Sequence, residues 1–466
     1  MPDPSIPSVF LAPGEAPHAI PVTFVNAATW PLARARLDPG AAAFAEAAGF
    51  EPRAGRHLLL PGPDGRLTGV LFGLEPADDP GKDLFRPGAL PALLPAGAYR
   101  FANAPHDGRL AALAFALGCY RFARYRRAED KVVRLGLPSG ADAAELARIV
   151  EGVTLARDLI STPANDMGPP ELEAAARTLA ARHGATVTAI VGDDLLAQNF
   201  PLVHAVGRAA DRAPRLVDIV WGEAGHPKVT LIGKGVCFDT GGLDIKTEAG
   251  MLNMKKDMGG AATVLALAHM LMDRGAKLRL RVLLPIVENA IGGAAFRPRD
   301  IYRSRKGITV EIGNTDAEGR LILADALALA DEETPDLVID MATLTGAARV
   351  ALGTEVVPFY ADDDALAAEL ARCGEAESDP LWRLPLWRSY DSMLDSKVAD
   401  INNIAVGGFA GSIIAALFLR RFVSAAKAWL HFDIYAWNQA TRPGRPEGGE
   451  CQGARALYRF IVSRYG

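Results

Sequence analysis

Cysteine is scarce in this chain of 466 residues, and its scarcity argues against two kinds of site. The cysteines are Cys119, Cys237, Cys373 and Cys451. They are widely scattered and form no CxxC pair, whereas disulfide frameworks and thiolate zinc sites need suitably spaced cysteines. We therefore expect a reducing, cytoplasmic location and no cysteine-based metal site.

Long apolar runs and an excess of positive charge are also missing. No uninterrupted apolar stretch approaches the roughly 18 to 20 residues of a membrane-spanning helix. The start of the chain, MPDPSIPSVF, has neither basic residues nor an apolar core, so we expect no signal peptide. The formal net charge of -5 argues against a protein that coats nucleic acid. We expect neither a membrane nor a nucleic acid as a partner.

Length and composition predict a folded protein with two domains. The chain is too long for one ordinary core, and half of its residues are apolar while 23% are charged. A break at 138–140 precedes a long helical pattern at 141–160. We therefore place a smaller α/β domain at 1–138 and a larger domain at 139–466, with the helix at 141–160 as the linker.

The larger domain alternates between strand-like and helix-like segments. We expect its strands at 185–191, 216–221, 229–232, 278–286, 308–312, 337–341 and 429–434. We expect its helices at 170–183, 260–274, 321–331, 365–373 and 413–425. This alternation predicts an α/β fold with a mostly parallel sheet flanked by helices. In the smaller domain, a helix is expected at 110–125 and a strand at 131–135.

The most informative run of residues is NTDAEGRL at 314–321, between a strand-like and a helical segment. It places Asp316, Glu318 and Arg320 within five residues. Carboxylates two residues apart point to opposite sides of a strand and lie about 200° apart on a helix. They converge most easily in a loop, and open α/β sheets place ligands where a strand leads into a helix.

Two earlier blocks carry further acids and lysines. The block at 233–246, GKGVCFDTGGLDIK, holds Lys234, Asp239 and Lys246 among glycines that let the backbone turn sharply. In the block MKKDMGGAA at 254–262, Asp257 comes just before a helix, where the helix dipole favours a carboxylate.

The four loop carboxylates would repel one another unless cations neutralised them. Divalent metal ions are the natural choice, and several carboxylates can hold two ions bridged by water. Because these blocks contain no histidine, ligand hardness suits Mg or Mn, while zinc stays open.

Taken singly, several of these residues have ordinary structural explanations. Asp239 suits a turn, and Asp257 suits a helix cap. Cys237 has no histidine near it in the sequence and suits a small core position better than a nucleophile. His269 and His431 stand in apolar segments that are typical of structural histidines. The glycines at 233–235 lack the GxxxxGK[ST] pattern of a phosphate-binding loop.

Together, however, the blocks resemble the leucyl aminopeptidase family, the M17 metallopeptidases. The resemblance is carried by IGKG at 232–235, FDTGG at 238–242, DIK at 244–246, MKKDMGGAA at 254–262, NTDAEGRL at 314–321 and DMATLTGA at 340–347. It covers about residues 150–425, including the segments at 156–165 and 411–419.

The resemblance implies a two-metal centre with an assigned set of residues. The implied metal ligands are Lys234, Asp239, Asp257, Asp316 and Glu318. The implied catalytic pair is Lys246 and Arg320. The residues implied to shape the substrate or bicarbonate pocket are Met254, Asn314, Ala317, Thr343, Leu344 and Gly346. A lysine must be neutral to bind a metal, and both burial and divalent charge would lower its pKa.

The resemblance also implies a reaction, the hydrolysis of the first peptide bond. A water that bridges the two metals attacks the carbonyl, Lys246 and one metal stabilise the oxyanion, and the other metal binds the free α-amine. Bicarbonate held by Arg320 acts as the base, which suits an arginine at a helix N-terminus. Family members are commonly hexamers, so a homo-hexamer that acts on peptides with a free N-terminus is expected, with Zn, Mn or Mg as the metal.

Two other functions remain open at the level of sequence. Carboxylate clusters also serve phosphoryl transfer, so a two-metal phosphoesterase is one alternative. A non-catalytic binding protein derived from a peptidase is the other, although such a protein would usually have lost a ligand. The loop at 435–453 departs from the family pattern, so we do not extend the DNA binding of some members to this chain.

Overall fold

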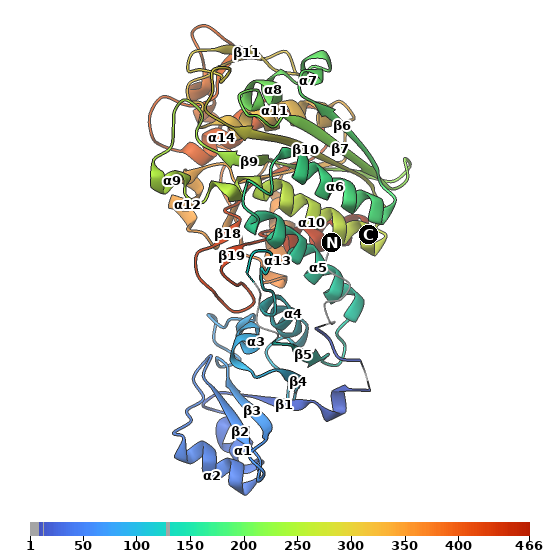
Figure 1. Ribbon diagram of the computed structural model, residues 1–466, viewed down its shortest axis with the longest axis vertical. Helices are drawn as coiled ribbons and strands as arrows, with labels where there is room; N and C mark the ends of the chain where they lie inside the picture. Colours follow the sequence, from blue (N-terminus) through green and yellow to red (C-terminus); the bar gives the residue numbers. More distant parts are fainter. Residues whose placement is uncertain (1–8, 13, 127–130) are drawn as a thin grey trace. The chain divides into compact units, whose positions relative to one another are not determined.

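The computed structural model describes residues 9–12, 14–126 and 131–466 (Figure 1). These residues form two compact units. The larger unit holds Leu155–Asn438 and Gly448–Gly466. The smaller unit holds the described residues up to Thr154 together with Gln439–Glu447, so the chain returns to it near its end.

The smaller unit contains a five-stranded sheet in the order β2-β3-β1-β4-β5. Its strands are β1 (Ile20–Val25), β2 (His57–Pro61), β3 (Leu67–Gly73), β4 (Gly97–Phe101) and β5 (Val133–Gly136). All pairs are parallel except the antiparallel pair β2 and β3. Its helices include α1 (Trp30–Ala35), α2 (Pro39–Ala47), α3 (Leu90–Leu93) and α4 (Gly108–Gly118).

Helix α4 is shorter than the sequence pattern predicts. It ends at Gly118, whereas apolar periodicity predicted a helix to 125. The guanidinium of Arg121 donates hydrogen bonds to the carbonyls of Gly118 and Tyr120, which satisfies groups that a further helical turn would otherwise use. Residues 127–130 lie outside the described part of the chain.

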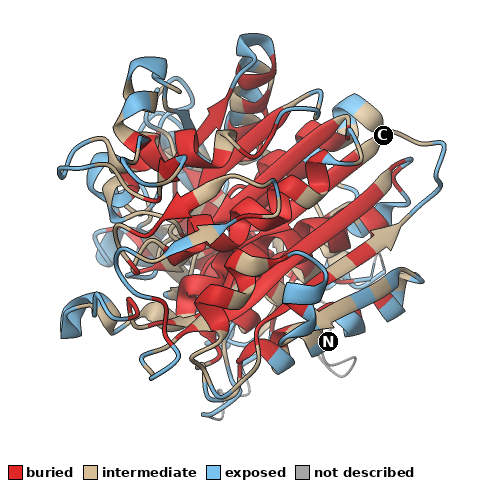
Figure 2. Cartoon of the chain, turned by 90° about the horizontal axis from the view of Figure 1, so that it is seen from above, coloured by how far each residue is buried: buried red, intermediate tan, exposed pale blue. Residues whose placement is uncertain are grey.

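The larger unit contains a nine-stranded, mostly parallel sheet in its described residues, which confirms the predicted α/β class. Its main strand order is β15-β14-β17-β13-β8-β10-β7-β6, and β9 pairs with β10. The strands are β6 (Thr186–Val191), β7 (Arg215–Trp221), β8 (Lys228–Gly233), β9 (Gly235–Asp239), β10 (Arg279–Asn289), β13 (Leu337–Ala342), β14 (Val357–Ala361), β15 (Leu381–Arg383) and β17 (Trp429–Asp433). The central strands β8 and β13 are mostly apolar because nearly all of their residues are buried, and Figure 2 shows how widely the buried residues extend through the sheet.

Helices cover both faces of this sheet (Figure 1). One layer contains α6 (Pro169–His183), α10 (Gly259–Arg274) and α15 (Ala454–Tyr465). The other contains α8 (Pro201–Gly207), α11 (Glu318–Asp331) and α14 (Gly411–Arg420). Further elements of the larger unit are α9 (Glu248–Met251), η3 (Met254–Met258), β12 (Thr309–Glu311), α12 (Gly346–Leu352), α13 (Asp364–Ala376) and β16 (Ile401–Asn402). The helix predicted at 141–160 is observed as α5 (Ala143–Ser161).

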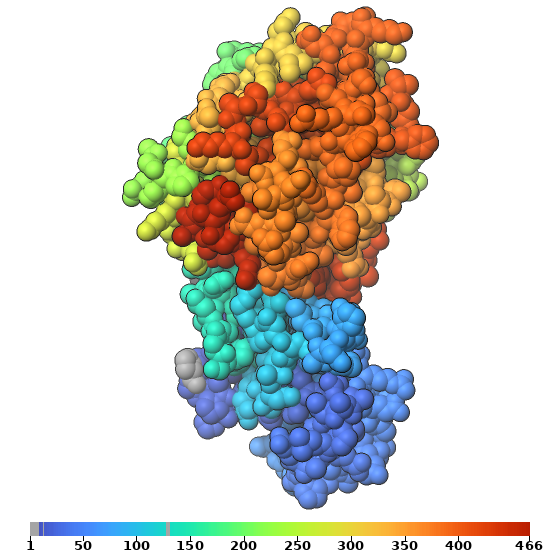
Figure 3. All heavy atoms as spheres, turned by 180° about the vertical axis from the view of Figure 1, so that it is seen from behind, coloured from blue at the N-terminus to red at the C-terminus, as the bar shows by residue number. Residues whose placement is uncertain are grey.

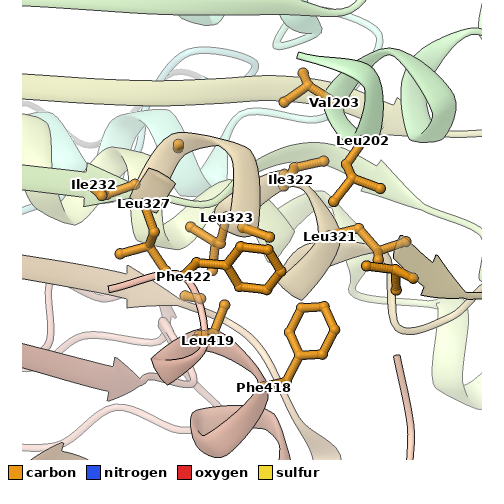
Figure 4. Close-up of a cluster of buried hydrophobic side chains, with 14 of the residues drawn as sticks. Leu202, Val203, Ile232, Leu321, Ile322, Leu323, Leu327, Phe418, Leu419 and Phe422 are labelled. Carbon is orange, nitrogen blue, oxygen red and sulfur yellow. The ribbon is translucent and has the colours of Figure 1, made fainter. Parts of the chain in front are cut away.

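The core of the second layer lies between α8, α11 and α14 (Figure 4). Leu321 and Ile322 of α11 pack in one cluster with Leu202 of α8 and with Phe418 of α14. Because α11 is buried along nearly its whole length, its residues from Leu321 to Ala330 are apolar apart from Asp325. This burial holds the first turn of α11, which carries Glu318, in a fixed position.

Helix α14 also ends earlier than predicted, at Arg420 instead of 425. The carboxylate of Asp331 accepts hydrogen bonds from the backbone amides of Ser424, Ala425 and Ala426. Those amides therefore bind a side chain and not the carbonyls of a preceding helical turn. The segment between α13 and α14 contributes to the orange surface of the larger unit in Figure 3. None of the described helices is long and apolar enough to cross a membrane.

Candidate metal centre and active site

The candidate site lies where strands of the large sheet end and two helices begin. Asp239 is the last residue of β9, and Lys234 stands between β8 and β9. Asp257 belongs to η3, immediately before α10, and Glu318 is the first residue of α11. Asp316 lies in the loop that leads into α11. Five residues from three stretches of the chain, 234–239, 257 and 316–318, therefore meet at the edge of the sheet where α/β proteins bind their ligands.

These side chains line one pocket of about 140 Å³. Its lining consists of Lys234, Asp239, Lys246, Met254, Lys256, Asp257, Asp316, Glu318, Thr343, Leu344, Thr345, Gly346, Arg349, Ile434 and Tyr435. Most of the residues proposed from the sequence are thus brought together. Within the described chain, Arg320, Asn314 and Ala317 are not part of this lining.

Two lysines divide the acids into two neighbouring ion-paired groups. The ammonium of Lys234 lies 2.8 Å from Asp257 Oδ2 and 2.8 Å from Glu318 Oε1. The ammonium of Lys246 lies 2.8 Å from Asp239 Oδ2 and also contacts Asp316 Oδ1. Four acids therefore face two cations in a small, largely buried space.

The acids fit a metal site. Oxygens of Asp239, Asp316 and Glu318 lie within 4.8 Å of one another. Glu318 is 1% exposed, and its Oε2 accepts no hydrogen bond from any residue that the structure describes. A buried carboxylate oxygen without a partner is costly unless a cation binds it. The donor set therefore suits divalent ions.

Burial and crowding disturb the protonation of these groups. Burial raises the pKa of Glu318 to about 8, and the charge of Asp239 adds to this effect. Burial, with Asp239 again adding, raises the pKa of Asp316 to about 6. Burial alone would lower the pKa of Lys234, but Asp257 and Glu318 outweigh it and raise that pKa. The acids thus have too little positive charge around them, and metal ions would supply it.

Arg320 is buried beside this pocket on the first turn of α11. Its Nη1 donates a hydrogen bond to the carbonyl of Asn403 at 2.7 Å. Its Nε is buried and has no hydrogen-bond partner among the described residues. Burial lowers the pKa of Arg320 to about 10, which still leaves it a cation at neutral pH. A buried N–H group without a partner, at a helix start, suits a small anion.

Two asparagines that the sequence analysis missed hold the loops of the site. The Asn403 side chain accepts hydrogen bonds from the amides of Gly313 at 2.7 Å and Asn314 at 3.2 Å. The Asn289 amide donates to Asp239 Oδ1 at 2.9 Å and to the carbonyl of Thr315 at 3.2 Å. Both asparagines lie far from their partners in the sequence, so no local pattern could have identified them.

Two more basic residues, Lys256 and Arg349, also line the pocket, and the sequence analysis missed both of them. The Lys256 ammonium lies 4.5 Å from the centre of the Tyr435 ring. The Arg349 guanidinium lies 5.8 Å from the centre of the same ring. Burial lowers the pKa of Lys256 to about 8. The pocket lining therefore adds two basic side chains and an aromatic ring to the acids and the two ion-paired lysines.

The residues assigned to structural positions are buried. Burial raises the pKa of the Cys237 thiol well above its ordinary value, which makes it a poor nucleophile. His431 is fully buried, and its Nδ1 lies 2.5 Å from Asp340 Oδ1. His269 is also buried, with its Nδ1 3.0 Å from Nε2 of His183.

Comparisons with known families cover nearly the whole described chain. Residues 154–458 match the model described as the cytosol aminopeptidase family, catalytic domain. Residues 20–138 match the model described as the M17 aminopeptidase, N-terminal domain. The two matches therefore correspond to a smaller N-terminal domain and a larger catalytic domain.

Curated proteins and solved structures agree with these matches. A probable cytosol aminopeptidase of Roseiflexus castenholzii is 40% identical over 363 residues, which span 74% of each chain. The crystal structure of the cytosol aminopeptidase from Coxiella burnetii is 44% identical, with a TM-score of 0.91, and covers 96% of this chain and 98% of that one. The bottromycin maturation enzyme BotP, solved in complex with Mn, is 34% identical, with a TM-score of 0.85, over 96% of this chain and 99% of that one. The chain belongs to the M17 cytosol aminopeptidase family.

Proposed function

We propose that this protein removes the N-terminal residue from peptides through a two-metal centre at the site described above. Its family is one of metal-dependent aminopeptidases. The observation that carries the two-metal assignment is the buried, unpartnered Glu318 oxygen among the oxygens of Asp239 and Asp316. Lys234 and Asp257 complete the proposed ligand set, since Asp257 lies beside Lys234 in the same pocket.

The chain's own residues would divide the work of hydrolysis. Bound divalent ions would supply a Lewis acid and lower the pKa of a water molecule. Lys246, which lines the same pocket, would donate a hydrogen bond to the carbonyl oxygen as negative charge develops on it. Arg320, whose buried Nε lacks a partner, would hold bicarbonate, which supplies a general base.

The remaining pocket residues would orient the peptide. Met254, Thr343, Leu344 and Gly346 line the pocket and are proposed to contact the substrate. Thr343 also donates a hydrogen bond to Asp257 Oδ1 at 2.7 Å, which fixes that carboxylate. Asn314 and Ala317 would contact the substrate or bicarbonate through the backbone of the loop before α11.

Several finer properties are part of the same proposal. Zinc or manganese is the proposed metal, since BotP was solved with Mn and oxygen ligands accept either ion. We propose a homo-hexamer in the cytoplasm, because the resemblance implies a hexamer and the relatives are named cytosol aminopeptidases. The catalytic residues all lie within 139–466, so we propose that part as the catalytic domain and 1–138 as a domain without catalytic groups.

The test uses the purified full chain on Leu-p-nitroanilide and on the dipeptide Cys-Gly. Activity is measured before chelation, after chelation, and after Mn, Zn or Mg is added back. We expect chelation to abolish release of the N-terminal residue and one of the ions to restore it. Absence of turnover from protein shown by elemental analysis to hold two metals would refute the aminopeptidase assignment. Turnover of p-nitrophenyl phosphate in its place would favour the phosphoesterase.

A further inference from the structure

Lys256 is a basic residue of the pocket that the proposed mechanism leaves without a role. Its side chain lines the pocket although the residue is only 5% exposed. No carboxylate in the described part of the chain lies within 4.0 Å of its ammonium. Its observed contact is the Tyr435 ring, 4.5 Å away. A buried ammonium that stacks on an aromatic face and forms no ion pair is poorly compensated for its lost hydration.

Arg349 adds a second cation to the residues that line the pocket. It lies on α12, lines the same pocket, and reaches the Tyr435 ring at 5.8 Å. The nearby acid Asp433 is already engaged: it accepts hydrogen bonds from the amides of Leu344 and Thr345 and from hydroxyl groups. Asp433 therefore holds the pocket loop in place. Among the residues that the structure describes, no carboxylate forms an ion pair with either Lys256 or Arg349.

We propose that Lys256 and Arg349 form a subsite that binds a carboxylate of the substrate, so that peptides with an acidic N-terminal residue are preferred. This inference rests on the proposed aminopeptidase function. Lys256 directly precedes Asp257, which belongs to the acidic group that would anchor the amino end of the peptide. We assign this carboxylate to the side chain of the first residue, because both cations line the same pocket as Met254, Leu344 and Gly346, which are proposed to contact the substrate.

Lys256 and Arg349 would make the pocket bind an acidic side chain more tightly than an apolar one of similar size. Met254, Leu344 and Ile434 would accept an aliphatic side chain by burying its surface. However, an aliphatic side chain would also cover the Lys256 ammonium without giving it an anion. A glutamate side chain has aliphatic carbons for these residues and a carboxylate for the two cations.

The decisive comparison is between Glu-p-nitroanilide and Gln-p-nitroanilide, which differ in charge but hardly in size. We expect metal-loaded enzyme to show a kcat/KM at least about tenfold higher for Glu, as is typical of a charge-assisted contact. Lys256→Met should reduce this ratio to near one, and Lys256→Arg should retain most of it. Arg349→Met should lower the ratio partially, because Arg349 is exposed to solvent.

Control variants and substrates keep the outcome interpretable. The exposed Lys277 lies outside the pocket, so Lys277→Met should leave the ratio unchanged. Turnover of Leu-p-nitroanilide shows that each variant is folded and metal-loaded. If wild-type enzyme cleaves the Leu substrate but does not prefer Glu over Gln, the subsite is refuted while the aminopeptidase function stands. If no arylamide or dipeptide is cleaved, the aminopeptidase function itself fails.

A second pair of substrates tests the position of the carboxylate. Leu-Gly and Leu-Gly-amide share an N-terminal residue and differ only in the charge of the C-terminal end. If Lys256→Met lowers kcat/KM for Leu-Gly but not for the amide, and the Glu to Gln ratio is unaffected, the subsite serves the C-terminal carboxylate and our assignment to the side chain is wrong. Stronger competition by free L-glutamate than by L-glutamine, lost in Lys256→Met, would support our assignment.

Discussion

At the scale of single residues, the site is a problem of charge balance. The pocket is lined by Asp239, Asp257, Asp316 and Glu318. Lys234 and Lys246 each form ion pairs with two of these acids. The pKa of Glu318, raised to about 8, records how poorly two lysines compensate four acids, of which Asp239, Asp257 and Glu318 are buried. The residue types and their loop positions were predictable from the sequence. The pairing of each lysine with particular acids was not, since it depends on side-chain geometry.

Replacing Lys246 tests its proposed role in stabilising the transition state. Lys246→Ala should retain metal and lower kcat by roughly a hundredfold to a thousandfold, because one donor to the developing oxyanion is lost. Steady-state kinetics on Leu-p-nitroanilide, together with metal content, provides the measurement. Lys277→Ala is the control for removal of an exposed lysine. An increase in KM at unchanged kcat would contradict the role.

At the scale of elements, the position of the site depends on close contact between strand ends and helix starts. A Cβ at Gly260, in the first turn of α10, would lie 2.1 Å from the carbonyl oxygen of Met341 in β13. One at Gly233, where β8 ends, would lie 2.5 Å from Cα of Ala261. Only glycine lets this helix approach the sheet so closely, and η3 with Asp257 is positioned as a result.

Gly260→Ala should therefore damage both stability and the site. We expect a loss of at least about 2 kcal/mol in the free energy of unfolding, because the backbone of Met341 cannot move away easily. We also expect weaker metal binding, because α10 would shift together with Asp257. Thermal unfolding and metal titration provide the measurements. Gly293→Ala is the matched control, since a Cβ there meets no atom within 4 Å. Equal melting temperatures for the two variants would refute this account.

The contact between α11 and α8 predicts a dependence of stability on pH. Asp325 of α11 is fully buried and accepts hydrogen bonds from the amides of Leu202, Val203 and Arg305. Burial raises its pKa from 3.8 to about 7. The folded protein therefore holds a proton that the unfolded chain has lost, and stability falls as the pH rises between these two values.

Asp325→Asn removes this titrating group and keeps one oxygen acceptor. Relative to this variant, the wild type should lose roughly 3 kcal/mol of stability between pH 4 and pH 7. Denaturant unfolding at a series of pH values measures the difference. Parallel curves for the two proteins would show that the carboxylate is already ionised throughout this range.

Sequence patterns predicted most elements of the larger unit, because apolar periodicity reflects burial. They failed where a local contact overrides periodicity. Asp331 ends α14 by binding three backbone amides, and Arg121 satisfies the carbonyls at the end of α4. Strand β9 was missed because its sequence, GVCFD, is short and lies among glycines. Its place in the sheet comes from pairing with β10, which is remote in the sequence.

At the scale of the whole molecule, metal binding should stabilise the folded protein. The proposed ligands come from segments between 234 and 318 that are brought together only by folding, so the unfolded chain has no comparable site. Chelation should lower the melting temperature by several degrees, and adding back the activating ion should restore it. Asp316→Ala should abolish this response. An identical melting temperature with and without metal would indicate that no site of useful affinity exists.

The sequence by itself determined the fold class, the loop positions of the acids and the resemblance to a family, because these follow from patterns of neighbouring residues. The tertiary structure alone decided which distant groups meet. It brought Asn403 and Asn289 to the site loops, returned 439–447 to the smaller unit, and placed Tyr435 beside Lys256 and Arg349. Such contacts join residues that are far apart in the chain, and only the packing of strands and helices specifies them.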